Sequence, residues 1–153
     1  MSRLKKSAAV MAVAVGMIGG YEGLRLYSYP DIIGVWTACY GETRGIKPGM
    51  KFTKVQCDDM LAKRLVEFET GMRACLKHPD SIPDKPYIAF LSLSYNIGTG
   101  GFCKSSVARL ANQGDIEGAC NRIPAFNKAG GKVVRGLVNR RADEQKYCLS
   151  GLK

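Results

Sequence analysis

After residue 53, apolar residues recur at helical spacing in blocks that are separated by turns rich in glycine and proline. Thr53 and Gln56 have the spacing of a capping box, which predicts the start of a helix over residues 54–74. Prolines mark residues 78–86 as a loop, and a strongly apolar core helix is predicted over residues 87–97, closed by Gly98, Gly100 and Gly101. Further helices are predicted over residues 105–112, 115–122 and 135–149.

The stretch before residue 53 has a different pattern. Leu24 and Leu26 keep helical spacing until Pro30 interrupts it, so we expect a short helix that ends near Tyr27. Residues 32–40 are β-branched and aromatic, and glycines and a proline follow them, which predicts two or three short strands. A small sheet followed by a helical body is an α+β fold, and 153 residues suffice for one domain made of two lobes.

The N-terminus has the layout of an export signal. Arg3, Lys5 and Lys6 precede the uncharged, apolar stretch of residues 7–20, an order that leaves the basic end in the cytoplasm. Small residues in the stretch could form a cleavage site, or the stretch could remain as a weak membrane anchor, being shorter than the ~20 residues of a comfortable span. A buried helix of the mature domain is the third alternative. The predicted division is residues 1–20 as export signal or releasable anchor and residues 21–153 as the folded domain.

Charge and cysteine content indicate where such a protein works. Its 23 lysines and arginines outnumber 13 acidic residues, for a formal charge of +10, which favours a polyanionic partner such as nucleic acid, anionic lipid or the bacterial wall. A solvated basic face is the alternative. The six cysteines are widely spaced without a Cys-x-x-Cys pair, which favours disulfides in an oxidising compartment over zinc binding, with free buried thiols as the alternative. Spacing alone determines none of the pairings.

The residues available for catalysis are mainly carboxylates. The one histidine, His78, lies in a polar loop, so histidine triads and multi-histidine metal sites are excluded, and no cofactor or metal is expected. Glu22, Asp31 and Thr37 follow one another across a predicted helix end, turn and strand, which could place them around one cleft. Glycoside hydrolysis needs one carboxyl group that donates a proton and a second that steadies the sugar cation or positions water. A helix cap and a turn residue are the alternative reading of the two acids.

A family resemblance gives these residues a context. The run from Glu22 to Gly49 resembles the signature of phage-type lysozymes, the endolysins of glycoside hydrolase family 24, and it keeps their Glu, Asp and Thr spacing. Residues 93–102 (LSYNIGTGGF) and residues 129–141 (AGGKVVRGLVNRR) are similar to the family's core helix and last helical segment. The resemblance covers essentially the whole chain after Tyr21 and implies a small β-sheet lobe, a larger helical lobe and an active cleft between them.

The resemblance also implies an activity. It makes the protein a lysozyme (EC 3.2.1.17), a muramidase that hydrolyses the β-1,4 bond between N-acetylmuramic acid and N-acetylglucosamine with inversion, for host cell lysis. Glu22 would be the general acid, Asp31 would hold the attacking water and Thr37 would help to position it. The expected partner is peptidoglycan, contacted by a monomer. Substrate-binding candidates are Asn96, Tyr95 and Ser105, with ordinary helix packing as the alternative for all three.

One departure concerns Glu42. Many relatives carry a histidine after the Tyr-Gly pair, whereas here Glu42 follows Gly41. We expect either a lost structural ion pair or hydrogen bond, or a third acid near the cleft.

The N-terminal segment resembles the signal anchors that some endolysins release from the membrane. The resemblance implies export by the host secretion machinery, a stay in the host inner membrane with the N-terminus cytoplasmic, and release into the periplasm. Because Glu22 comes directly after the segment, the cleft could not assemble while the segment lies in the bilayer. The competing functions are a basic nucleic-acid-binding protein, which leaves the Glu22, Asp31 and Thr37 pattern unexplained, and a catalytically inactive wall-binding module on the same fold. We therefore expect no nucleic-acid partner.

Overall fold

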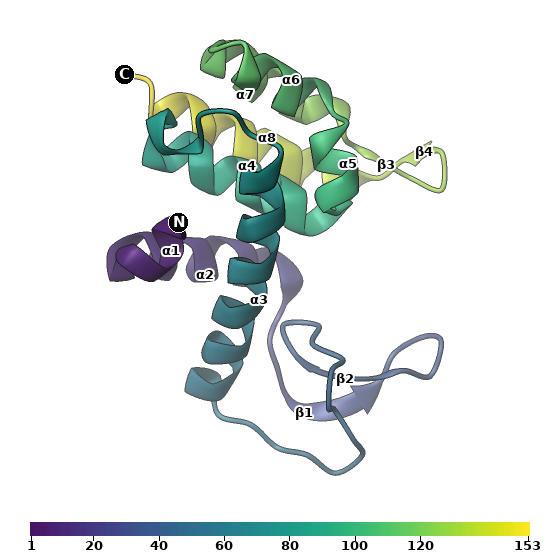
Figure 1. Ribbon diagram of the computed structural model, residues 1–153. Coiled ribbons are helices and arrows are strands. Elements are labelled where there is room, and N and C mark those ends of the chain that lie inside the picture. Colours follow the sequence, from purple (N-terminus) through teal and green to yellow (C-terminus); the bar gives the residue numbers. More distant parts are fainter. The chain divides into compact units, whose positions relative to one another are not determined.

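The computed structural model describes residues 1–153, and the chain divides into two compact units (Figure 1). Unit 1 comprises Met1 and residues 3–66, and unit 2 comprises Ser2 and residues 67–153.

Unit 1 opens with two helices, α1 (Arg3–Lys6) and α2 (Ala8–Glu22). Ser7 caps α2, since its hydroxyl accepts a hydrogen bond from the Val10 N–H at 3.2 Å. The helix ends at Glu22 because Gly23 adopts a positive φ of 79°, a left-handed conformation that glycine tolerates best. The expectation of a helix reaching Tyr27 is therefore wrong.

The apolar N-terminal stretch packs into unit 1. Val10, Ala14 and Ile18 are buried along one side of α2. Gly19 lies so close to the Tyr40 ring that an added Cβ would come within 2.9 Å of it, so only glycine fits there without rearrangement. In this structure the stretch forms a helix that is buried along one side and exposed along the other, and the three alternatives for it stay predictions. None of the chain's helices is both long enough and apolar enough to cross a bilayer. A boundary at residue 20 stays a prediction.

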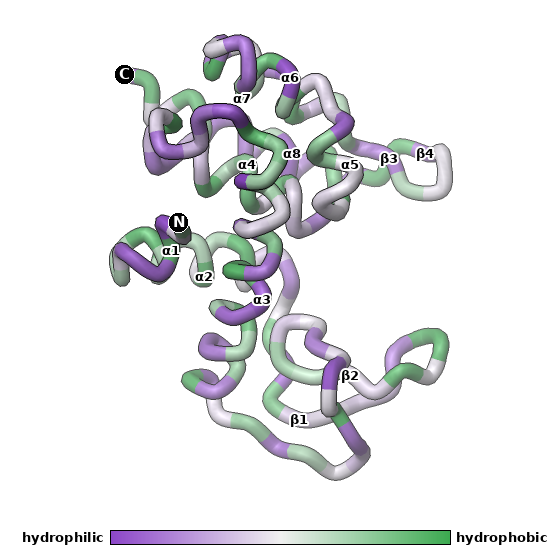
Figure 2. The backbone as a smooth tube through the Cα atoms, viewed as in Figure 1, coloured by the Kyte–Doolittle hydropathy of each residue, from purple (hydrophilic) through white to green (hydrophobic).

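A short antiparallel hairpin follows α2, made of β1 (Arg25–Pro30) and β2 (Trp36–Cys39). Its register places Tyr29 opposite Thr37. The turn between the strands, residues 31–35, contains two isoleucines and a valine, and much of it is green in Figure 2. The predicted strand region of residues 32–40 is thus confirmed from Trp36 onward, whereas β1 was expected to be helical. The strand forms because pairing partners at residues 36–39, and Lys51 through an isolated bridge to Tyr27, outweigh the local spacing of two leucines.

The helix α3 (Lys54–Ala74) has the predicted bounds and the predicted start. The Thr53 N–H donates to Gln56 Oε1 at 2.8 Å, and the Gln56 N–H donates to Thr53 Oγ1 at 3.2 Å. These reciprocal bonds are the two halves of a capping box.

Unit 2 is helical around α4 (Asp84–Ile97), whose residues 86–94 are all buried. The predicted core helix is confirmed, although it starts at Asp84.

Gly98 ends α4 with φ 90°, but a further short helix that was not predicted follows at once. The remaining helices of the unit are α5 (Thr99–Cys103), α6 (Ser106–Asn112), α7 (Ile116–Arg122) and α8 (Arg135–Ser150), with 3-10 turns at Pro79–Ser81 and Ile123–Ala125. An unpredicted two-residue hairpin joins β3 (Lys128–Ala129) to β4 (Lys132–Val133). A small sheet lobe and a mainly helical body confirm the α+β class.

All six cysteines form disulfides. The pairs are Cys39–Cys57, Cys75–Cys103 and Cys120–Cys148, with Cα–Cα distances of 4.9, 5.7 and 5.6 Å. Cys39–Cys57 lies within unit 1 and the other two lie within unit 2. The free-thiol alternative is therefore wrong.

Candidate active site

Glu22 is the last residue of α2 and is half-buried. The helix holds its backbone on one side, and the left-handed Gly23 turns the chain into β1 on the other. The sequence predicted Glu22 within a helix that continues to about Tyr27, whereas the structure places it at the helix end.

Asp31 is held by the turn that it starts. One of its carboxylate oxygens, Oδ1, accepts hydrogen bonds from the backbone N–H of Ile33 at 3.0 Å and of Val35 at 2.8 Å. Its own N–H donates to the Val35 carbonyl at 2.9 Å, and the Gly34 N–H donates to the Asp31 carbonyl at 2.9 Å. Both side-chain bonds go to Oδ1, so the carboxylate has a defined orientation with one oxygen committed to the turn.

Thr37 connects to the same turn through Val35. The Thr37 hydroxyl donates to the Val35 carbonyl oxygen at 2.9 Å, and the side chain is buried. Because Asp31 binds the Val35 N–H while Thr37 binds the Val35 carbonyl, one residue links the two predicted side chains. The structure thus brings Asp31 and Thr37 together around Val35, a link that no sequence pattern indicated.

Glu42 forms an ion pair with Arg64. Arg64 donates from Nε to Glu42 Oε2 at 2.8 Å and from Nη2 to Oε1 at 2.9 Å, a bidentate arrangement. Burial alone would raise the pKa of Glu42, but the bonds from Arg64 and from the Arg44 N–H outweigh it and hold that pKa below its ordinary value. Glu42 is therefore an acid paired with Arg64, and the loss of the interaction made by the relatives' histidine stays a prediction.

Two more links fasten the end of β2 to α3. The Cys39–Cys57 disulfide lies two residues after Thr37, and Cys39 takes a positive φ of 59°. The Tyr40 hydroxyl donates to Asp58 Oδ1 at 2.5 Å, and Lys54 pairs with Asp58 Oδ2 at 2.8 Å. Burial and the bond to Asp58 raise the pKa of Tyr40. These links hold the strand that carries Thr37.

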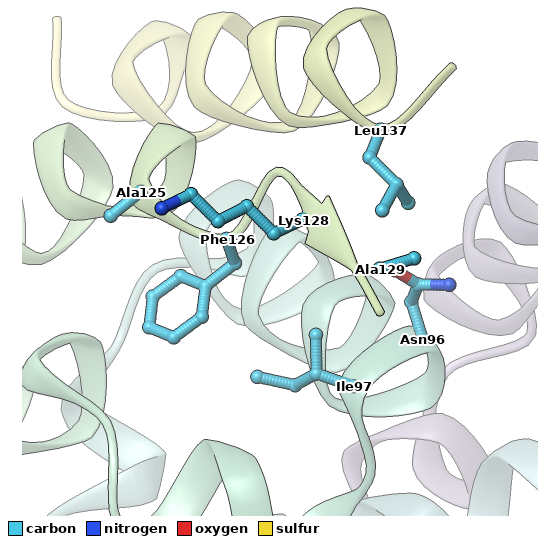
Figure 3. A pocket seen from close by; sticks show the side chains of 7 residues that line it. All are labelled: Asn96, Ile97, Ala125, Phe126, Lys128, Ala129 and Leu137. Carbon is cyan, nitrogen blue, oxygen red and sulfur yellow. The ribbon is translucent and has the colours of Figure 1, made fainter. Parts of the chain in front are cut away.

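The substrate-binding candidates all belong to unit 2. Asn96, near the end of α4, accepts a hydrogen bond from the Arg141 guanidinium through Oδ1. It borders a cavity of about 510 Å³, and Figure 3 shows its amide at one edge and the Phe126 ring at the other. The remaining lining residues are Ile97, Ala125, Lys128, Ala129 and Leu137.

Tyr95 and Ser105 have identifiable packing roles. The Tyr95 ring lies 4.8 Å from the Phe68 ring, centroid to centroid. The Ser105 hydroxyl donates to the Phe102 carbonyl at 2.6 Å and accepts from the Ala108 N–H at 3.2 Å, so it caps α6. Helix packing, the alternative reading, describes Ser105 well.

A buried charged network supports the Asn96 side of the cavity, and sequence reasoning missed it. Glu144, fully buried on α8, accepts from Arg141 Nη1 at 2.5 Å and from Arg140 Nε at 3.3 Å, and also from the Ser92 hydroxyl. Arg141 Nε donates to the Phe126 carbonyl at 2.9 Å. Arg141 therefore binds both edges of the cavity, Asn96 and Phe126. The available signal was the spacing of Arg140, Arg141 and Glu144 along one helix.

The model of the phage lysozyme family matches residues 19–144, a stretch that includes Glu22, Asp31, Thr37 and Asn96. The chain belongs to the phage lysozyme family. As a phage lysozyme it is a glycosidase of the lysozyme type.

Similar phage lysozymes carry a more specific name. The chain is 39% identical over 145 residues to the SAR-endolysin of Bacteriophage PS119, covering 94% of this chain and 86% of the relative. The SAR-endolysin of Enterobacteria phage P21 gives 39% identity with 94% and 87% coverage. That of Pseudomonas phage phiKMV gives 36% identity with 97% and 93% coverage. These are relatives along nearly the whole of both chains.

Solved phage lysozyme structures are similar to this one. The active form of the P1 phage endolysin Lyz superposes with a TM-score of 0.80 at 27% identity, covering 95% of this chain and 94% of that chain. The secreted inactive form of the same endolysin gives a TM-score of 0.55 at 26% identity, with 72% and 77% coverage. This phage lysozyme is therefore more similar to the form described as active.

Proposed function

We propose that this phage lysozyme is an endolysin that hydrolyses the β-1,4 bond between N-acetylmuramic acid and N-acetylglucosamine in peptidoglycan. The observation that carries the proposal is the linkage of Asp31 and Thr37 through Val35, which orients both side chains in one short turn. Glu22, at the end of the preceding helix, supplies the second carboxyl group that glycoside hydrolysis needs.

Glu22, Asp31 and Thr37 each perform one part of this mechanism. Glu22 donates its proton to the glycosidic oxygen as the bond to the anomeric carbon breaks. Asp31 takes a proton on Oδ2 from a water that attacks the anomeric carbon from the opposite face, while Oδ1 keeps its two bonds to the turn. Because the Thr37 hydroxyl gives its hydrogen to Val35, its oxygen accepts the water's other hydrogen. The anomeric configuration is inverted, and exchange with solvent returns Glu22 and Asp31 to their starting states.

Asn96 and Tyr95 are the sugar-contacting candidates that we retain. Arg141 occupies Oδ1 of Asn96, which leaves the Nδ2 amide to donate to a sugar hydroxyl or acetamido oxygen. Ser105 is assigned to capping α6, because its hydroxyl already donates one bond and accepts another.

We also propose that the protein is exported and held at the host inner membrane by residues 7–20 until these leave the bilayer. The name SAR-endolysin shared by several relatives supports this. So does α2, whose residues Val10, Ala14 and Ile18 are buried in the folded chain and would lose this packing with the segment in the bilayer. Since Glu22 ends the same helix, membrane insertion would keep it from its place beside β1.

The test compares wild type with Glu22→Gln on permeabilised Gram-negative cells and on purified peptidoglycan. Glu117→Gln, which neutralises an exposed acid on α7, is the matched control. We expect Glu22→Gln to lower the clearing rate by about 10²–10⁴-fold, the usual contribution of a general acid. Mass spectrometry should find new reducing ends at N-acetylmuramic acid, and NMR should show the inverted anomer first. Equal clearing by wild type and Glu22→Gln would remove Glu22 from the mechanism, and binding without clearing by either would indicate a wall-binding module.

A further inference from the structure

The turn between β1 and β2 exposes an unusual amount of apolar surface. Ile32 has a relative exposure of 104% and its neighbour Ile33 one of 80%, and Val35 is exposed as well. In Figure 2 this turn is a green loop that extends beyond the ends of the two strands. Single exposed aliphatic residues are common on protein surfaces, but two adjacent, almost fully exposed isoleucines at the tip of a hairpin indicate a binding surface.

The turn holds these side chains outward. Four hydrogen bonds close it: the two that Asp31 Oδ1 accepts, the bond from the Asp31 N–H to the Val35 carbonyl and the bond from the Gly34 N–H to the Asp31 carbonyl. Gly34 sits at φ 85°, a left-handed conformation that lets the chain reverse. Because the turn is closed by its own backbone, Ile32 and Ile33 do not fold back onto the unit.

The sheet lobe has more exposed basic than acidic residues, which favours binding to an anionic surface. The exposed basic residues of the sheet lobe are Arg25, Arg44, Lys47 and Lys51. The acids between residues 23 and 53 are Asp31, bound to its turn, and Glu42, paired with Arg64. Tyr27 is exposed too. Exposed aliphatic side chains at the tip of a lobe with more basic than acidic residues have the composition that binds anionic membrane interfaces. Arg25 pairs with Cys39, at the end of the hairpin away from this tip.

We propose that residues 31–35 form a membrane-docking finger, which seats Ile32 and Ile33 in a phospholipid bilayer that contains anionic lipid. The lipid is favoured over a glycan because aliphatic side chains bury well among acyl chains and offer neither a stacking ring nor a hydrogen bond to a sugar. The consequence for activity rests on the proposed function. Asp31 begins the same turn, so a seated finger holds its carboxylate at the lipid surface and away from the wall.

Tryptophan fluorescence tests the contact without relying on catalysis. Trp36 is the only tryptophan, so the full-length Trp36→Phe/Ile32→Trp variant carries its one indole at the tip. The matched control is Trp36→Phe/Val133→Trp, which places the indole at a 60% exposed position on the β4 hairpin of unit 2. With vesicles of phosphatidylethanolamine and phosphatidylglycerol, we expect a blue shift and quenching by brominated acyl chains at position 32 only. No quenching at position 32, or equal quenching at both positions, would overturn the proposal.

A second measurement tests the role of the two isoleucines and the consequence for Asp31. Ile32→Thr/Ile33→Thr keeps β-branched residues in the turn and should lower vesicle affinity by about tenfold, since two apolar side chains lose their lipid contact. Added vesicles should inhibit wall clearing by wild type and leave the double variant less inhibited. An unchanged vesicle affinity of the double variant would overturn the proposal that residues 31–35 dock to a membrane. A protein that does not lyse cell walls but still shows quenching at position 32 would overturn the proposed function and support membrane docking by residues 31–35.

Discussion

Single side chains in unit 1 are oriented by neighbours close in sequence. Asp31 and Thr37 both bind Val35, and Asp31 also binds Ile33, so the candidate water-positioning residues depend on one turn. The family pattern was sufficient to select Glu22, Asp31 and Thr37 as candidates. It could not show that Arg64 pairs with Glu42, because these residues are 22 positions apart and meet only after folding.

At the scale of residues, the ion pair of Glu42 with Arg64 predicts how the stability of the protein depends on pH. Its folded-state pKa lies below the ordinary value of 4.5, so its contribution to stability is present above pH 4.5 and is lost as the pH falls through the folded-state pKa. Glu42→Gln removes that contribution. We expect the Tm of wild type to fall more steeply than that of Glu42→Gln as the pH drops from about 5 to about 3. Differential scanning calorimetry of both proteins measures this.

The control for the pH experiment is Glu117→Gln, whose parent residue is exposed and for which no ion pair is found. It should keep the steepness of wild type. The same acid dependence in Glu42→Gln as in wild type would show that the Arg64 pair does not contribute to stability.

At the scale of elements, the end of β2 is fastened to α3 at three places. These are the Cys39–Cys57 disulfide, the Tyr40–Asp58 hydrogen bond and the Arg64–Glu42 ion pair. The Cys120–Cys148 disulfide fastens α7 to α8 within unit 2, with a loop of comparable length: 28 residues separate these cysteines and 18 separate Cys39 from Cys57. The two disulfides therefore have similar effects on the unfolded chain but different neighbours.

This difference predicts different effects on catalysis. Cys39→Ala/Cys57→Ala and Cys120→Ala/Cys148→Ala should each lower the free energy of unfolding by about 2–4 kcal/mol. Only the first should also lower kcat, because Cys39 lies two residues after Thr37 and its positive φ loses its support. Denaturant unfolding and initial clearing rates, measured where each variant is folded, separate the two effects. An equal loss of kcat in both double variants would show that Cys39–Cys57 has no special role in positioning Thr37.

At the scale of the whole molecule, one segment is proposed to occupy two environments. Residues 7–20 are apolar enough to resemble an export anchor, and in the folded protein α2 buries one side in unit 1. Ala12 and Gly16 lie on its exposed side, and nothing lies within 4 Å of a Cβ added at Gly16. Substitutions at these positions can change membrane affinity while the folded packing is kept.

Ala12→Leu/Gly16→Leu should therefore delay lysis. Each leucine contributes roughly −0.5 kcal/mol to membrane insertion, so the anchored state gains stability and release slows. We expect more protein in the membrane fraction and a later onset of lysis in induced cells, with unchanged specific activity for the released protein. Ala12→Ser/Gly16→Ser is the polar control and should lyse earlier. Identical lysis times for both variants would contradict membrane anchoring by this segment.

The sequence by itself determined the features that depend on neighbouring residues. The capping box and the bounds of α3, the core helix α4 and the helices α6, α7 and α8 were predictable, because helix periodicity and caps act over a few positions. The spacing of Glu22, Asp31 and Thr37 indicated the family for the same reason.

Tertiary structure decided the features that depend on distant partners. β1 is a strand because residues 36–39 and Lys51 pair with it, which overrides two leucines at helical spacing. The cysteine pairing, the Arg64 partner of Glu42 and the Glu144 network likewise require side chains that are far apart in the chain. Such contacts form only when folding has met the entropy cost of closing long loops, and no local pattern encodes which partners will meet.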